Sequence, residues 1–233
     1  MSKKIIKFIN TTNLELEPPK PAKNYIPEWF KETTPYIGDK NEYSKTTRAT
    51  IKKCLPVFDA ITSGYLFLTP VDFWITIEDG IPYYYWKSES IHQFAPIHFQ
   101  AANQAEKHPF QKNHPWKDVP KIINPWSIQT PKGYSCLILP PMHRETPFNI
   151  FPAIVDTDSY KAPVNFPFVL FNQNLTGLIP AGTPVAQIIP FKRESWESES
   201  STDSESSLRQ LHFISTFFYN AYRNHMWSRK EFK

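Results

Sequence analysis

Proline is spread so densely along this chain that long helices are excluded from all but its C-terminal end. There are 23 prolines but only 6 glycines among 233 residues, and an internal proline removes a helix hydrogen bond and clashes with the preceding turn. Between the prolines lie short runs rich in β-branched and aromatic residues, bounded by turn-forming sequences. These runs cover residues 126–130, 135–139, 148–155, 164–171 and 185–191. The pattern predicts a mainly β protein: a compact antiparallel β-sandwich, a jelly roll or a β-clip-like fold.

Two segments are predicted to form β-hairpins. Residues 71–77 and 83–86 flank Glu78-Asp79-Gly80, and Asp-Gly between two such runs is a strong signal for a tight turn. The stretch LTGLIPAGTPVAQIIPFKRE, residues 175–194, reads as two strands joined by a glycine-containing turn. Its apolar side chains available to the core are Ile179, Val185, Ile188 and Phe191.

The rest of the sequence divides into an arm, a body and a tail. Residues 1–50 predict an N-terminal strand and a proline-rich arm, in which residues 27–33 could form one helical turn with Pro27 at its first position. Residues 51–194 predict the β-domain. Within that domain, residues 88–121 show little periodicity and predict a long surface excursion. Residues 195–207 are rich in serine and acidic side chains, which is typical of a flexible loop.

A C-terminal helix is predicted over residues 208–233, packed on the β-domain, with another subunit as the alternative partner of its apolar face. Apolar residues recur there at helical spacing, and Ser207 with Gln210 matches the capping-box pattern. The residues of the apolar face are Leu208, Leu211, Ile214, Phe218 and Ala221.

Charge and cysteine content narrow the function classes. The net charge is +4, but residues 54–193 carry as many acidic as basic side chains, whereas a nucleic-acid-binding domain usually has a concentrated basic face. Nucleic acid is therefore not an expected partner. The chain has no run near the roughly 20 apolar residues of a membrane span, and its start lacks the apolar core of a signal peptide. We expect no membrane partner, no classical secretion and two reduced thiols, Cys54 and Cys136.

A metal site is one candidate for chemistry. His143 and Glu145 lie two residues apart, a spacing that puts both on one face of a strand, and His212 could supply a third ligand. The alternative is a solvated loop with a charge pair, because the segment PPMHRETP is bracketed by prolines. The sequence contains no nucleophile elbow, P-loop or dinucleotide fingerprint, and no cofactor is expected.

Aromatic and acidic side chains supply two further candidates. In the run of residues 83–86, alternate side chains point to opposite faces, so Tyr83, Tyr85 and Trp86 are candidates for binding a sugar, a base or a partner chain. Asp156 and Asp158 share one face and are candidates for a base and a metal or sugar contact. They could equally be carboxylates that cap a turn at the end of a strand.

Several segments resemble an uncharacterised protein family of tailed phages, notably T4-like phages of marine bacteria, and of some bacteria. The matching segments are KKCLPVFDAITSGY, PWSIQTPKGYSCLILPP, IVDTDSY and IPAGTPVAQIIPFKRESW. The resemblance implies a phage or phage-like gene and a single β-domain. It implies no activity, because the family has none established.

The chain also resembles, in architecture, the dUTPase and dCTP deaminase β-clip superfamily. TPKGYS, AIVDTDSY and AGTPVAQIIPF occur in that superfamily's order, and the resemblance implies a base-like role for Asp156 or Asp158 and a hairpin glutamine at Gln187. Three features depart from it. His143-Arg144-Glu145-Thr146 replaces the phosphate-binding motif, Lys-Ala follows Tyr160, and no glycine-rich C-terminal flap exists.

The sequence therefore favours a phage-encoded, non-enzymatic binding or structural protein, in the virion or the host cytoplasm. Homo-oligomers and other phage proteins are the expected partners. The alternative is an enzyme on a β-clip or double-stranded β-helix scaffold, either a dUTPase-like nucleotide hydrolase or a non-haem iron oxygenase. A fold alone does not decide between these functions.

Overall fold

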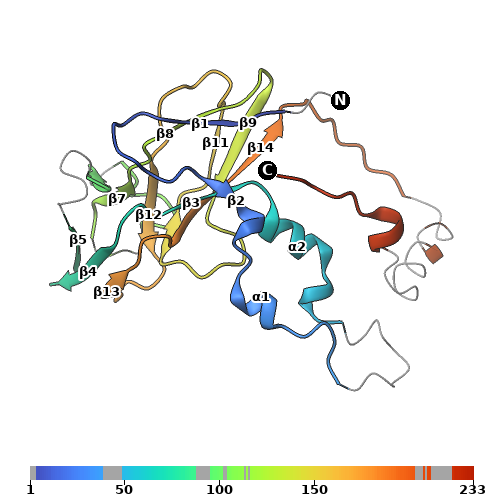
Figure 1. Ribbon diagram of the computed structural model, residues 1–233, viewed down its shortest axis with the longest axis horizontal. Coiled ribbons are helices and arrows are strands. Elements are labelled where there is room, and N and C mark those ends of the chain that lie inside the picture. The colour runs from blue at the N-terminus through green and yellow to red at the C-terminus, as the bar shows by residue number, and fades with distance from the viewer. Residues whose placement is uncertain are drawn as a thin grey trace.

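The computed structural model of this protein consists of a β-body with short helices on one side (Figure 1). The structure describes residues 4–38, 49–87, 95–101, 104–112, 114, 116–202, 207, 209–210 and 222–233. All strand pairings within these residues are antiparallel. The prediction of a mainly β, antiparallel sandwich-like or β-clip-like fold is confirmed.

The largest sheet has five strands in the order β11-β9-β14-β3-β2. These strands are β11 (Ala153–Val155), β9 (Tyr134–Leu139), β14 (Pro184–Lys192), β3 (Tyr65–Leu68) and β2 (Lys20–Pro21). Strand β14 lies at the centre and pairs with β9 on one side and β3 on the other. Its backbone is therefore held from both sides.

A four-stranded sheet follows the order β10-β12-β7-β6, and a three-stranded sheet the order β13-β4-β5. The first comprises β10 (Phe148–Ile150), β12 (Phe166–Leu170), β7 (Val119–Ile122) and β6 (Ile97–Gln100). The second comprises β13 (Gly177–Ile179), β4 (Phe73–Glu78) and β5 (Ile81–Trp86). A separate pair joins β1 (Lys7–Asn10) to β8 (Trp126–Gln129).

The inner faces of these sheets meet in one hydrophobic core. Phenylalanine rings connect the sheets edge to face: Phe148 of β10 contacts Phe73 of β4, and Phe67 of β3 contacts Phe166 of β12, with ring centroids 6.2 and 5.0 Å apart. Such aromatic contacts add to the free energy gained from burying their surface. Both cysteines are free thiols, with Cys136 buried in this core.

Short helices flank the β-body on one side, away from β4 and β5 (Figure 1). They are η1 (Ala22–Asn24), α1 (Glu28–Glu32), η2 (Ile51–Lys53) and α2 (Leu55–Thr62), and a π-helical turn covers Tyr222–Met226. Helix α1 begins after Pro27, close to the helical turn predicted there. Helix α2 was not predicted, although Leu55-Pro56 places proline in its first turn, where the missing N–H costs nothing.

The β6–β7 region differs from the prediction. Residues 88–121 were expected to be a surface excursion, yet Ile97 and Val119 are buried in strands of the four-stranded sheet. Each strand has only four residues, and Pro120 lies within β7, so no alternating pattern was long enough to read.

The predicted hairpin at 175–194 is also different in the structure. Strand β13 pairs with β4, whereas β14 pairs with β3 and β9, so the two strands belong to different sheets. The turn between them is held against the β3–β4 connection, where Thr69 N donates to Thr183 O and Gly182 N donates to Thr69 O. Ile179, Val185 and Ile188 do lie in the core.

The apolar residues of the predicted C-terminal helix lie outside the described residues. Beyond the π-helical turn, residues 227–233 are not helical. They contact α2 and β3, because the Trp227 indole and Lys230 both donate to the Asp59 carboxylate, and Tyr65 OH donates to Lys233 O. No helix among the described residues is long and apolar enough to cross a membrane.

Candidate functional site

Asp156 and Asp158 meet at Arg193, just beyond the end of β14. The Arg193 backbone N–H donates to Gly133 O, which extends the β14–β9 pairing by one residue and places its side chain over the 156–160 turn. One guanidinium nitrogen, Nη1, lies 2.9 Å from Asp158 Oδ1 and 3.1 Å from Asp156 Oδ1. The other, Nη2, donates to Asp158 Oδ2. Arg193 thus holds both carboxylates, with a two-pronged contact to Asp158.

Further donors from β9 and from the turn that precedes it complete this cluster. The Ser135 hydroxyl donates to Asp156 Oδ1 over 2.6 Å, and Gly133 N donates to Asp158 Oδ2 over 2.8 Å. Between the two aspartates, the buried Thr157 shares a 2.7 Å hydrogen bond with Thr130. These contacts fasten the turn that follows β11 to the turn that precedes β9.

The electrostatics differ between the two carboxylates. The Asp158 side chain is only 8% exposed, and its hydrogen bonds from Arg193 and Gly133 hold its pKa well below the usual range. The Asp156 side chain is 61% exposed. Asp158 is therefore an anion that Arg193 and Gly133 hold in place and that stabilises the turn.

Asp158→Asn is expected to lower the thermal stability in a pH-dependent way. Because the folded-state pKa is depressed, the carboxylate stabilises the fold above its unfolded pKa, and this contribution is lost as the pH falls toward the folded value. The difference in Tm between wild type and variant should be largest near neutral pH and shrink below a pH of about 4. Thermal melts across this pH range measure it. The control is Asp79→Asn in the exposed β4–β5 turn; a pH-independent difference for Asp158→Asn contradicts the assignment.

Gln187 lies at the centre of β14 and is fully buried. Its Oε1 accepts a hydrogen bond from Met142 N, and its Nε2 donates to Ala60 O and Ser63 O, over 2.9, 2.9 and 2.7 Å. All three partners are backbone groups of this chain. The side chain therefore ties β14 to α2 and to the β9–β10 loop, and it presents no group to a ligand.

His143 and Glu145 lie in that β9–β10 loop and not on a strand, so the alternation of strand faces does not apply to them. His143 has a positive φ of 55°, and both side chains are exposed. The His143 carbonyl accepts a hydrogen bond from the Trp29 indole. In the part of the chain that the structure describes, no cluster of three metal-binding side chains occurs, and His212 lies outside that part. The metal hypothesis remains a prediction.

Arg144 lies between these two residues, and the sequence analysis assigned no role to its side chain. Its guanidinium donates to four backbone carbonyls, those of Met142, Ala22, Tyr25 and Ile61. Burial lowers the pKa of this group to about 10. Since Ile61 lies in the last turn of α2, the cation also complements that end of the helix. Arg144 faces inward to the fold and not toward a phosphate.

The aromatic residues of β5 divide between the two faces of its sheet. Tyr83 and Tyr85 are exposed, whereas Tyr84 and Trp86 pack against the core. The predicted alternation therefore occurs. Of the three candidates for binding, Tyr83 and Tyr85 lie on the open face. Trp86 follows Tyr85 directly, so its side chain points to the opposite, inner face.

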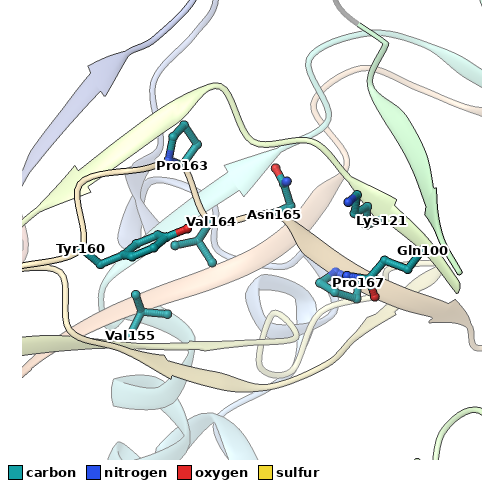
Figure 2. A pocket seen from close by; sticks show the side chains of 8 residues that line it. All are labelled: Gln100, Lys121, Val155, Tyr160, Pro163, Val164, Asn165 and Pro167. Carbon is teal, nitrogen blue, oxygen red and sulfur yellow. The ribbon is translucent and has the colours of Figure 1, made fainter. Parts of the chain in front are cut away.

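A pocket of about 390 Å³ lies beside the aspartate turn, on the outer face of the four-stranded sheet (Figure 2). Tyr160, which is 49% exposed, lies at one end of the pocket in this view, and Lys121 lies toward the other. Lys121 is the one charged side chain among the eight lining residues. The lining residues are Gln100, Lys121, Val155, Tyr160, Pro163, Val164, Asn165 and Pro167.

Comparison with known proteins gives a weak likeness at the level of structure. No protein-family model matches the chain, and no curated protein matches it. Similar solved structures include a mutant dUTPase of Staphylococcus bacteriophage 80alpha with dUpNHpp, at 10% identity and a TM-score of 0.34, covering 86% of this chain and 90% of that one. A mutant dUTPase from phage phi11 of S. aureus has 9% identity and a TM-score of 0.33, covering 86% and 99%.

Proposed function

We propose that this protein is a phage-encoded, non-enzymatic binding protein that holds a small planar anion of the nucleotide class in the Tyr160 pocket. The observation that supports the proposal is the division of charge at this site. The carboxylates next to the pocket are held by Arg193, while Lys121 is the charged group of the lining. A cation at one end and an exposed aromatic ring at the other suit a ligand with a ring and an anionic group.

The arrangement supports binding better than hydrolysis. Cleavage of a nucleoside triphosphate depends on positioned charges and, in such enzymes, on carboxylates that hold Mg²⁺ or orient water. Here the Asp158 carboxylate is paired with Arg193, and the Gln187 side chain is hydrogen-bonded to backbone groups of Met142, Ala60 and Ser63. Arg144, within the replaced phosphate-binding motif, faces backbone carbonyls.

Nucleotide hydrolysis is a second candidate because of one observation. The Asp156 side chain is more than half exposed, and its neighbour Val155 lines the pocket. A carboxylate there could orient a water molecule toward a bound ligand. This candidate requires turnover, which the first one excludes.

Calorimetric titration with dUMP and dUTP, each with and without Mg²⁺, tests the proposal together with an assay for pyrophosphate release. We expect binding without turnover. Tyr160→Ala should weaken binding roughly 10-fold or more, since stacking of a base on an aromatic ring contributes about 1–3 kcal/mol. Lys121→Gln should weaken dUTP binding more than dUMP binding, and Lys7→Gln on strand β1, which does not line the pocket, is the matched control.

Two results would count against this function. Absence of binding for every nucleotide contradicts it, and turnover that Asp156→Asn abolishes establishes the second candidate in its place. Metal analysis of the purified protein addresses the iron-dependent alternative, because stoichiometric iron would support the prediction for His143, Glu145 and His212. Virion proteomics tests the predicted location in the virion or the host cytoplasm.

A further inference from the structure

Strand β5 forms an open edge of the three-stranded sheet. It pairs with β4 on one side, and no described strand pairs with its other side. An open edge exposes a row of backbone N–H and C=O groups that can pair with another strand. The edge is therefore a surface at which a further strand can add to the sheet.

The turn before β5 decides which of its backbone groups face this open side. Asp79 and Gly80 have φ values of 51° and 78°, which is the geometry of a two-residue type I′ turn, and such a turn makes Glu78 and Ile81 a hydrogen-bonded pair. Because hydrogen-bonded and non-bonded pairs alternate, Tyr83 also bonds to β4. The backbone groups of Pro82, Tyr84 and Trp86 point to the open edge. Proline suits such a position, since it has no N–H to leave unpaired.

The sequence of this edge lacks the charges that usually keep strand edges apart. The six residues Ile81–Trp86 are IPYYYW, with no lysine or other charged side chain among them. On the outer face, Tyr83 and Tyr85 are 41% and 49% exposed. Tyr85 continues across Trp74 to Leu178 in the strand register, so an apolar row crosses the whole sheet.

We propose that two copies of this chain dimerise by antiparallel pairing of their β5 strands about a two-fold axis at Tyr84. In this register the Tyr84 backbone exchanges two hydrogen bonds with Tyr84 of the partner subunit. Trp86 N–H donates to the carbonyl of Pro82 of the partner subunit, and the reverse bond follows by symmetry. Pro82 has no N–H, so the second bond of each Trp86–Pro82 pair is absent and the Trp86 carbonyl is left without that donor.

The side chains also match across this seam. Tyr83 lies opposite Tyr85 of the partner subunit, in the closely spaced type of pair that brings aromatic side chains into contact. Two such pairs form, one on each side of the axis. A pocket of about 570 Å³ lies along β5, lined by Ile81, Pro82, Tyr83, Tyr84, Phe99, Trp116, Lys117 and Asp118.

The mass of the full chain in solution, measured by light scattering and sedimentation over a wide concentration range, tests this inference. We expect a dimer. The double variant Tyr83→Lys/Tyr85→Lys places like charges opposite each other at both pairs and should raise the dimer dissociation constant roughly 100-fold. The double variant Tyr83→Lys/Tyr85→Glu places opposite charges there and should remain dimeric.

The charge pattern makes the register itself testable. Leu178→Lys is the matched control, because it adds a charge to the same sheet face on the far strand and should leave the dimer intact. Circular dichroism and thermal melts confirm folding of each variant, whose altered side chains are exposed. A monomeric wild type overturns the proposal, and so does equal disruption by the two double variants. Nucleotide titration is read separately, so the dimer stands or fails independently of the proposed function.

Discussion

Gly64→Ala is expected to lower the free energy of unfolding by roughly 3 kcal/mol or more, through backbone strain together with a backbone clash. Gly64 follows the last turn of α2 with φ at +70° and leads into β3. A Cβ atom there would lie 2.2 Å from the carbonyl oxygen of Ile188. Ile188 cannot retreat easily, because β14 pairs with strands on both sides. The expected loss is therefore larger than that of a left-handed residue alone.

Gly182→Ala is the matched control for this clash. Gly182 also has a positive φ, +85°, but a Cβ atom there meets nothing within 4 Å. Its cost should be about 1–2 kcal/mol, from the left-handed conformation only. Urea denaturation of both variants measures the difference, with the m-value checked for two-state behaviour. Equal losses for the two variants would show that the α2–β14 contact is looser than its geometry indicates.

The elements that were predicted correctly are those that depend on neighbouring residues in the sequence. The β4–β5 hairpin was predicted from Asp79-Gly80 because the turn type depends on those two residues alone. The alternation of faces along β5 followed from the geometry of a strand. The helical turn at α1 was likewise predicted from Pro27 and the residues next to it.

Sheet membership was not predictable in the same way, because it depends on partners far away in the sequence. The run at 148–155 contains two strands, and β10 pairs with β12 while β11 pairs with β9. Likewise β13 and β14 adjoin in sequence but join different sheets. An apolar run shows that a segment is buried, but it does not show which neighbour it pairs with.

The candidate site shows the same limit. The sequence paired Asp156 with Asp158 and left two interpretations, a base with a metal or sugar contact and carboxylates that cap a turn. Both residues lie beyond the end of β11. Their common partner, Arg193, is 35 residues away from Asp158, and only the β9–β14 pairing brings it there. Arg144 escaped prediction because its partners are backbone carbonyls, which carry no sequence signature.

Gln187→Leu is expected to lower the free energy of unfolding by about 3 kcal/mol, because an unpaired buried polar group costs about 1–3 kcal/mol. Leucine has a similar volume but no polar atom, so Met142 N–H and the carbonyls of Ala60 and Ser63 all lose their partner. These groups belong to α2 with its C-terminal cap and to the β9–β10 loop, so the loss loosens both segments from β14. Chemical denaturation measures the loss.

A second glutamine separates this structural role from a general effect of the substitution. Gln129 lies on β8, is half-buried and donates a 3.3 Å hydrogen bond to Ser127 Oγ. Gln129→Leu should therefore cost less than about 1 kcal/mol. If Gln187 were instead a ligand-binding residue, as the hairpin resemblance implies, Gln187→Leu would abolish nucleotide binding while leaving stability unchanged. A large loss of stability shows that this glutamine serves the fold, because its amide is already committed to the backbone of α2 and the β9–β10 loop.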